Sequence, residues 1–513
     1  MTKSIEQLRR DAKALRRAHE AGERHARQRI ANYPPRPAGE ALKHADYLHV
    51  IARENSFQSW PALKIAADLH GLDRAAKQQR LRIALFSGHA HVVDRLLSET
   101  PNLADGLLGL QIALYDRLAV ENALARDPDA ANREIGGRPP LCHLTFSHYI
   151  HQRPDLAADM IKIAEMLVRG GASVDASMSV SPDNEHQLSA LYGALGHANN
   201  MVLARWLLEH GANPNDNESL YHSTELGHHE GLKMLLAHGA DPRGTNALLR
   251  AMDFDDVEAV RMLLDAGALA DEFDGRHVGG ERPWVVPALH QAARRLCPPE
   301  MVRVLLEAGA DPGRSFEGCS AYGYARVFGN VSLAREIEAR GAAVALTPQE
   351  DLLAMVADGE DTADRRVAPE KLPEAYRDII RTILHLPGKL DHVKRLIAVG
   401  QEFDKPDSEG LTPVQVAGWE GLPEVMAYLL SLGPDLEHQN GYGGTLLPTI
   451  VHGSENCPAR ATRDHVQCVR LALEAGVPVP RNAADRVGNP EIAELLETWT
   501  DQFPDRIVEG GAV

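Results

Sequence analysis

The sequence predicts an all-α solenoid of about eleven helix–turn–helix repeats, with hairpin loops and an N-terminal helical cap. The main observation is a phrase of the form Leu-Leu-x-x-Gly-Ala-Asp-Pro, which recurs along most of the chain. A second is the helical spacing of apolar residues ahead of each glycine, as in residues 300–306. A third is the low aromatic content of 5%, which suits close helix packing better than a β-sandwich or barrel.

The first 75 residues lack the recurring phrase, and we expect a separate helical region over residues 1–75. Residues 5–31 have the composition of one basic helix, which the prolines at 34, 35 and 37 end. Residues 40–54 and 59–70 are predicted to form two more helices. A cap that shields the first repeat is the favoured role, because terminal repeats need a different outer face. A basic docking arm is the alternative.

The recurring glycines set the period of the array, which is predicted to span residues 76–500. A glycine just past the last turn of a helix adopts the left-handed conformation that caps its C-terminus. The basic repeat is near 33 residues, with two shortened intervals of 28 and four longer ones. The glycines predicted to cap the second helix of each repeat are Gly171, Gly211, Gly239, Gly267, Gly309, Gly341, Gly400, Gly433 and Gly476.

This array resembles the ankyrin repeat. The clearest match is GLTPVQVA at residues 410–417, followed by Gly421, Val425 and Gly433. Further fragments lie at 137–141 and 287–293, and the resemblance covers roughly residues 80 to 500. The first two repeats of the array, near 81–105 and 107–134, are degenerate and lack the terminal glycine. Residues 51–64 look like a segment found ahead of ankyrin arrays in bacterial proteins.

Four insertions interrupt the repeats, near 148–157, 274–286, 358–385 and 453–463. Extra residues in repeats map to loops on one face. Segment 274–286 is predicted to form a long finger over the groove, and neutral loop drift is the alternative. Segment 358–385 is either a helical insertion used for dimer contact or a swollen repeat. A helix over 489–499 is expected to cap the C-terminal end, ahead of a tail at 501–513 that is frayed from residue 504.

Composition excludes several classes of function. The net charge of −18 argues against nucleic acid and against anionic membrane surfaces as partners. Five cysteines without a CxxC motif fit a reducing compartment, and no window has the apolar run of a signal peptide or membrane span. The glycine-rich stretch 441–445 lacks the phosphate-loop pattern, so no cofactor is expected. The protein is therefore predicted to be cytoplasmic, and a capped solenoid is commonly monomeric.

The resemblance to ankyrin repeats implies a protein that holds a protein or peptide partner in its concave groove. Aligning the repeats predicts which positions of each first helix face that groove. Aromatic side chains there would supply buried anchors, and arginines would pair with carboxylates. A register error of one residue would place some of these rings in the core instead. The candidate binding residues are Phe146, Phe254, Arg282, Trp284, Arg294, Arg295, Phe328, Trp419, Glu420 and Tyr442.

An enzyme or small-molecule receptor, with a pocket closed by the insertions, is the alternative. Glu225, Asp253 and His452 would then supply proton transfer, while Arg294 or Arg295 binds an anion. Cys457 is a remote candidate for a nucleophile. No sequence signature of a hydrolase, kinase or zinc protease supports this hypothesis.

A metal site is a further possibility of the sequence. His143, His148 and His151 cluster in one repeat and its insertion, and Glu225 or Asp253 would approach them across the groove. No metal is predicted on this basis, because histidines at repeat positions are more often structural.

Overall fold

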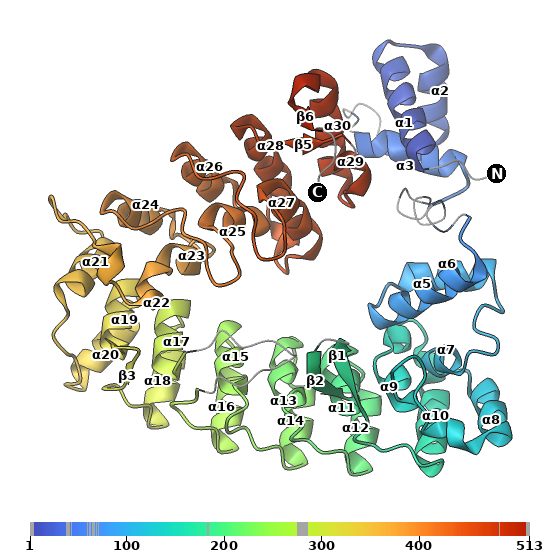
Figure 1. Ribbon diagram of the computed structural model, residues 1–513, viewed down its shortest axis with the longest axis horizontal. Helices are drawn as coiled ribbons and strands as arrows, with labels where there is room; N and C mark the ends of the chain where they lie inside the picture. Colours follow the sequence, from blue (N-terminus) through green and yellow to red (C-terminus); the bar gives the residue numbers. More distant parts are fainter. Residues whose placement is uncertain are drawn as a thin grey trace.

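The helices of this computed structural model stack in pairs, and the stack curves until its two ends meet (Figure 1). The first helix of each pair lies on the inside of the curve and the second on the outside. The structure describes residues 5–36, 42, 44–58, 60, 63, 67, 69, 71–181, 184–273, 286–481 and 483–508. Among these residues, no helix is both long and apolar enough to cross a membrane.

The N-terminal unit consists of helices α1 (Ile5–Glu20), α2 (Arg24–Asn32) and α3 (His44–Glu54). The predicted single helix over 5–31 is wrong, because the chain turns at residues 21–23 and Gly22 has a φ of 79°. Leu8, Leu15, Val50 and Ile51 are buried in a core that belongs to this unit alone. Most of the helix predicted over 59–70 lies outside the described residues.

The array follows as helix pairs that share one continuous core from Leu69 to Leu496. The inner helices are α5 (Arg74–Phe86), α7 (Leu108–Ala113), α9 (Pro140–Thr145), α11 (Ala190–Tyr192), α13 (Ser219–His222), α15 (Ala247–Asp253), α17 (Ala288–Arg295), α19 (Ala321–Phe328), α21 (Pro348–Asp358), α25 (Pro413–Trp419), α27 (Leu446–Asn456) and α29 (Ala483–Arg486). The outer helices are α6 (Ala90–Glu99), α8 (Arg117–Arg126), α10 (Ala157–Arg169), α12 (Met201–Glu209), α14 (Glu230–Ala237), α16 (Val257–Asp265), α18 (Pro299–Glu307), α20 (Val331–Ala339), α24 (Leu390–Ala398), α26 (Pro423–Ser431), α28 (His465–Ala475) and α30 (Pro490–Gln502).

The ends of the outer helices follow the sequence closely. All nine glycines predicted as caps have positive φ, from 68° at Gly341 to 101° at Gly267, which confirms the left-handed cap. At the N-terminal end of five outer helices, a short polar side chain accepts a hydrogen bond from the backbone N–H three residues on. This N-cap is Asp116 in α8, Asn200 in α12, Asp256 in α16, Asn330 in α20 and Asp464 in α28.

Strands are few and short. β1 (Ser177–Ser181) and β2 (Asn184–Ser189) form an antiparallel hairpin, as do β3 (Ser315–Phe316) and β4 (Cys319–Ser320). β5 (Val479–Pro480) pairs in parallel with β6 (Ile507–Val508), next to the short helix η8 (Pro504–Arg506). The expectation that the tail frays from residue 504 is therefore wrong for residues 504–508.

Three of the four predicted insertions form local helical structure. Segment 148–157 contains η2 (His148–His151) and η3 (Pro154–Leu156), and segment 453–463 contains η7 (Arg460–Thr462). Segment 358–385 contains η6 (Pro369–Lys371), α22 (Glu374–Arg377) and α23 (Ile379–Ile383), and α23 packs against α17 and α25. Of segment 274–286, only Val286 is described. Three further short helices are η1 (Pro128–Ala131), η4 (Gly193–His197) and η5 (Ser223–Glu225).

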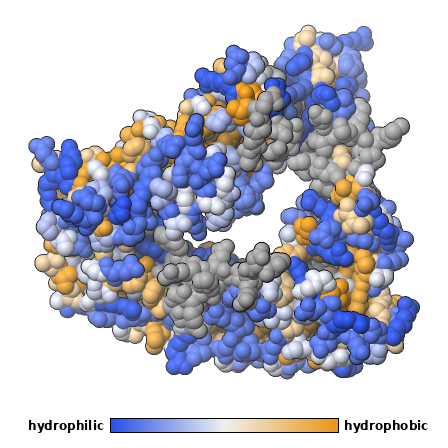
Figure 2. Space-filling model, viewed as in Figure 1, coloured by the Kyte–Doolittle hydropathy of each residue, from blue (hydrophilic) through white to orange (hydrophobic). Residues whose placement is uncertain are grey.

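The N-terminal unit closes the curve into a ring. Lys13 pairs with Glu497 at 3.2 Å and Arg16 with Glu494, which joins α1 to α30. On the other side, the guanidinium of Arg95 in α6 lies 5.1 Å from the ring centre of Phe57. The space-filling view shows an opening through the middle of the ring (Figure 2).

Candidate functional site

The inner face, formed by the inner helices and the turns that follow them, presents some of the predicted groove residues but not all. Phe254 is 51% exposed and Tyr442 is 75% exposed. Arg295, Trp419 and Glu420 are half-buried.

Other predicted groove residues are in the core. Phe328 is 1% exposed and Arg294 is 7% exposed, so the prediction that they face the groove is wrong. Phe328 stacks on Tyr324 of the same helix with ring centres 5.4 Å apart, and its ring centre lies 6.4 Å from that of Tyr376 in α22, which places it between repeats. Phe146 is also buried, at 2%, although its ring borders a cavity on the inner face. Arg282 and Trp284 lie outside the described residues.

A network of charged side chains crosses the inner face from η5 to α17. Arg250 Nε donates to Glu225 Oε1 at 2.7 Å, and its Nη1 donates to Asp253 Oδ2 at 3.2 Å. The other oxygen of Asp253 accepts from Gln291 Nε2 at 2.6 Å and from Arg295 Nε at 2.8 Å. Both carboxylates are therefore occupied by cationic or amide donors.

The same arginine lies between two aromatic rings. The guanidinium carbon of Arg250 is 4.9 Å from the ring centre of Phe254 and 5.6 Å from that of Tyr221. A guanidinium at this distance from a ring face is attracted by the ring quadrupole. Ion pairs and ring contacts together hold Phe254 beside a fixed positive charge, at the surface of the inner face.

His222 extends this network inward. Its Nδ1 lies 3.0 Å from Glu225 Oε2 and its Nε2 lies 3.3 Å from Glu218 Oε2. Burial alone would lower the pKa of His222, but hydrogen bonds to Glu218 and Glu225 raise it to about 9. Burial would likewise raise the pKa of Glu225, yet His222 and Arg250 lower it from its ordinary value. Glu225 is thus a carboxylate fixed in its ionised form by two cations, and a poor general base.

His452 is not part of that group. It lies on α27, on the opposite side of the ring from η5 and α15 (Figure 1), where its ring contacts Trp419 with centres 5.1 Å apart. Asn456 Nδ2 lies 3.0 Å from its Nδ1. The structure brings Glu225 and Asp253 together through Arg250, and it does not assemble the predicted acid/base group with His452.

Cys457 and Glu420 lie beside Trp419. The buried thiol of Cys457 donates to Glu420 Oε2 at 3.8 Å, and burial raises its pKa. A thiol held protonated is a weak nucleophile, so the structure argues against that predicted role. His465 Nε2 donates to the carbonyl of Trp419 at 2.8 Å and fixes the end of α25.

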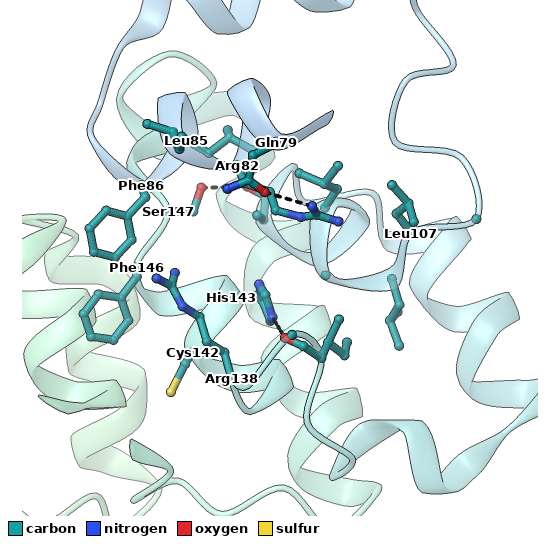
Figure 3. Close-up of a pocket in the computed structure, with 18 residues that line it drawn as sticks. Gln79, Arg82, Leu85, Phe86, Leu107, Arg138, Cys142, His143, Phe146 and Ser147 are labelled. Carbon is teal, nitrogen blue, oxygen red and sulfur yellow. Dashed lines mark hydrogen bonds between the residues drawn. The ribbon is translucent and has the colours of Figure 1, made fainter. Parts of the chain in front are cut away.

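A cavity of about 520 Å³ opens between α5, α7 and α9 (Figure 3). Arg82 and Phe86 border it from α5, and Arg138, His143 and Phe146 from the hairpin and helix of the third repeat. The rings of Phe86 and Phe146 are stacked, with centres 5.8 Å apart and planes 5° apart. Phe146 and His143 were predicted from the sequence, but Arg82 and Arg138 were not. Arg82 lies in the first, degenerate repeat, which gave no reliable register, and Arg138 lies in the hairpin ahead of α9, outside the helix positions that were aligned.

The three histidines of this region do not converge on a common point. His143 Nε2 donates to the carbonyl of Ile135 at 3.0 Å, and His151 Nε2 donates to that of Ala198 at 2.7 Å. His148 packs instead against His197, with ring centres 4.8 Å apart. Within the described parts of the chain, no three His, Cys, Asp or Glu side chains are arranged to hold a metal ion.

Paired helices that stack on one core, most of them followed by a left-handed glycine, define a helical repeat solenoid. Comparison of the sequence with known families then matches residues 191–274 to the family described as Ankyrin repeats (3 copies). The chain therefore contains ankyrin repeats.

Single proteins resemble this chain only over a short stretch or at low sequence identity. Protein phosphatase 1 regulatory subunit 27 of Homo sapiens and of Mus musculus is 38% identical over 58 residues, which is 11% of this chain and 38% of each relative. The match thus spans well under half the length of these curated relatives. The human ASB11 ankyrin repeat domain is 21% identical, with a TM-score of 0.34 over 47% of this chain and 100% of that one. An ankyrin repeat domain from Acinetobacter baumannii AYE is 26% identical, with a TM-score of 0.30 over 38% of this chain and 99% of that one.

Proposed function

We propose that the chain is a binding protein that holds a protein or peptide partner on its inner face. The observation that carries this proposal is Phe254, an exposed ring next to Arg250 on a network of occupied ion pairs. Aromatic and arginine side chains are the residues that most often dominate protein interfaces. Because Arg250 is already fixed by Glu225 and Asp253, little side-chain entropy is lost when a partner covers it.

A second contact region supports the same role. Trp419 and His452 lie together on α25 and α27, and these helices lie across the ring from α15, the helix that ends just before Phe254 (Figure 1). A partner that lies along the inner face would contact both regions. The relative matched above is named as a regulatory subunit of a phosphatase, which is in keeping with a role exercised through another protein.

The experiment compares partner capture by four forms of the full chain: the unmodified protein, Phe254→Ala, Trp419→Ala and Leu118→Ala. Leu118 is a matched control, since it is 61% exposed but lies on the outer helix α8. Proteins captured from the native lysate are quantified by mass spectrometry. We expect the same captured protein to fall at least tenfold with each inner-face variant and to be unchanged with Leu118→Ala. Equal capture by all four forms would contradict binding on the inner face.

A photo-crosslinking residue in place of Phe254 gives an independent readout, because it labels only what covers that position. Crosslinks to the captured protein are expected from position 254, and none are expected from position 118.

A further inference from the structure

The cavity between α5, α7 and α9 collects positive charge without a matching carboxylate. The guanidinium of Arg138 and that of Arg82 both border it. In the described part of the chain, neither arginine forms an ion pair, and none of the described residues that line the cavity is Asp or Glu. By contrast, Arg250 and Arg295 on the same inner face are both paired with Asp253.

Arg138 is held in place by a ring rather than by a counter-ion. Its guanidinium carbon lies 4.9 Å from the ring centre of Phe86. The carbonyl of Phe86 accepts a hydrogen bond from His197 Nε2 at 2.8 Å, which fixes the end of α5. Partial burial lowers the pKa of Arg138 from its ordinary value, but a guanidinium remains protonated near neutral pH. Its N–H groups therefore stay available as charged donors.

Arg82 is anchored at one point only. Its Nη1 donates to Gln79 Oε1, one turn earlier in α5, at 3.2 Å. Arg82 is exposed, and Figure 3 shows its guanidinium beside Gln79 and apart from that of Arg138. Each of these guanidinium groups has donors that no described residue uses, and such donors suit a carboxylate or phosphate oxygen pair.

His143 adds a neutral acceptor beside the arginines. Its Nε2 donates to the Ile135 carbonyl, so the proton lies on Nε2 and Nδ1 is left as an acceptor. Burial lowers the pKa of His143, and the charges of Arg138 and Arg82 lower it further. The ring can occupy this position because residue 109 is a glycine. A Cβ on Gly109 would lie 3.1 Å from Cε1 of His143.

The remaining lining is apolar. Leu107, Leu108 and Ile83 border the space on one side, and the edge of the Phe86–Phe146 pair borders it on the other. A volume of about 520 Å³ lies within the usual range of about 300 to 1,000 Å³ for small-molecule sites. It is larger than one carboxylate needs, so most of the space is left for an apolar or ring-shaped body.

We propose that this cavity binds a small organic anion, with its carboxylate or phosphate group on Arg138, in the field of the second positive charge at Arg82, and its apolar body against the apolar lining. This site is separate from the partner-binding region around Phe254 and does not depend on it. The two arginines favour anions over neutral molecules, and the stacked rings favour a ligand with a flat or aliphatic body.

The test measures binding of three probes to the full-length chain by calorimetric titration and by thermal shift. The probes are 3-phenylpropionate, phenyl phosphate and the neutral 3-phenylpropanamide. We expect at least one of the two anions to bind, to raise Tm, and to bind at least tenfold more tightly than the amide. Comparing the two anions shows which oxygen geometry the arginines prefer. Absence of binding by both anions at 10 mM would overturn the proposal, as would equal binding of the amide.

Variants locate the site. Arg138→Gln and Arg82→Gln are each expected to weaken anion binding about tenfold, whereas Arg335→Gln, an exposed arginine of α20, is the matched control and should bind as the unmodified chain does. Because Arg138 also packs on Phe86, its variant is checked for folding. Arg82 is exposed, so Arg82→Gln keeps the proposal testable if the other variant is unstable. Unchanged affinity in the folded arginine variants would show that the anion binds elsewhere, and the proposal would fall.

Discussion

Arg16 in the first helix donates a hydrogen bond to Glu494 in the last helix, across 478 positions of sequence. Together with the pair of Lys13 and Glu497, it joins the N-terminal unit to the last outer helix of the array and so closes the ring. All four side chains are partly exposed, from 13% at Glu497 to 39% at Arg16. Exposed pairs of this kind each contribute only about 0.2 to 1 kcal/mol, so the contact is sensitive to charge and to salt.

Reversing these charges is expected to open the ring. In Arg16→Glu with Lys13→Glu, α1 presents two negative charges to Glu494 and Glu497, and the radius of gyration from small-angle X-ray scattering should rise. Arg24→Glu, the same change on an exposed position of α2, is the control and should leave the radius unchanged. The swapped pair Arg16→Glu with Glu494→Arg should restore the compact form. A radius that is identical in all variants would show that apolar packing alone holds the ends together.

His222 is expected to stabilise the fold at low rather than high pH. Its pKa is about 9 when folded, above the ordinary value of 6.5, because Glu218 and Glu225 accept its hydrogen bonds. A raised pKa means that the folded state binds the proton more tightly, so the stabilisation is complete below pH 6.5 and is lost as pH rises through 9. A pKa raised from 6.5 to about 9 corresponds to a contribution of about 3 kcal/mol.

The measurement compares the chemical denaturation of the unmodified chain and of His222→Gln between pH 6 and pH 9.5. The difference in free energy of unfolding should be largest at pH 6 and should shrink as pH rises. A difference that is constant across this range would contradict the assigned cause.

The buried imidazole of His392 is expected to lower the free energy of unfolding. It is 3% exposed on α24, and neither ring nitrogen has a hydrogen-bond partner among the described residues. Burial lowers its pKa to about 3, so unfolding allows proton uptake below pH 6.5 and acid should destabilise the fold. A buried polar group without a partner costs about 1 to 3 kcal/mol. His392→Leu, close in volume, should therefore raise Tm at pH 7 and raise it further at pH 5, whereas a fall in Tm at both pH values would argue that the ring nitrogens are satisfied.

Gly193 is expected to tolerate no side chain. A Cβ at this position would lie 2.4 Å from Cε2 of Phe146, whose ring is itself stacked on Phe86. Gly193→Ala should displace Phe146 and cost about 1 to 3 kcal/mol in unfolding free energy, the usual penalty of overpacking. Adding Phe146→Leu removes the clash, so the double variant should recover part of the loss. If the losses in unfolding free energy of the two single variants simply add in the double variant, the ring of Phe146 does not restrain residue 193.

Much of the fold follows from local sequence. The nine capping glycines act through their own backbone conformation, so their roles are visible in a single repeat. The same holds for polar N-caps such as Asn330 and Asp464. These features depend on neighbours within four residues, and the sequence carries all of that information.

The inner face was harder to predict, because it depends on how successive helices rotate against each other. Phe254 was predicted on the surface and is exposed, whereas Phe328, at a similar place in its repeat, packs between Tyr324 and Tyr376. A one-residue difference in register decides between these outcomes, and only contacts with the next repeat fix it. The contact of Arg16 with Glu494 depends on the summed curvature of the entire stack, which no local pattern records.

Closure of the ring changes how the array responds to damage. In an open array each end repeat has one neighbour, and unfolding starts there because the fewest contacts are lost. Here α6 contacts Phe57 and α30 contacts α1, so the N-terminal unit lies against both ends of the array. A protease cut in any single connecting loop of such a ring leaves the two pieces associated through the remaining interface. Limited proteolysis should accordingly give nicked chains that still migrate as one species under native conditions and separate only in denaturant.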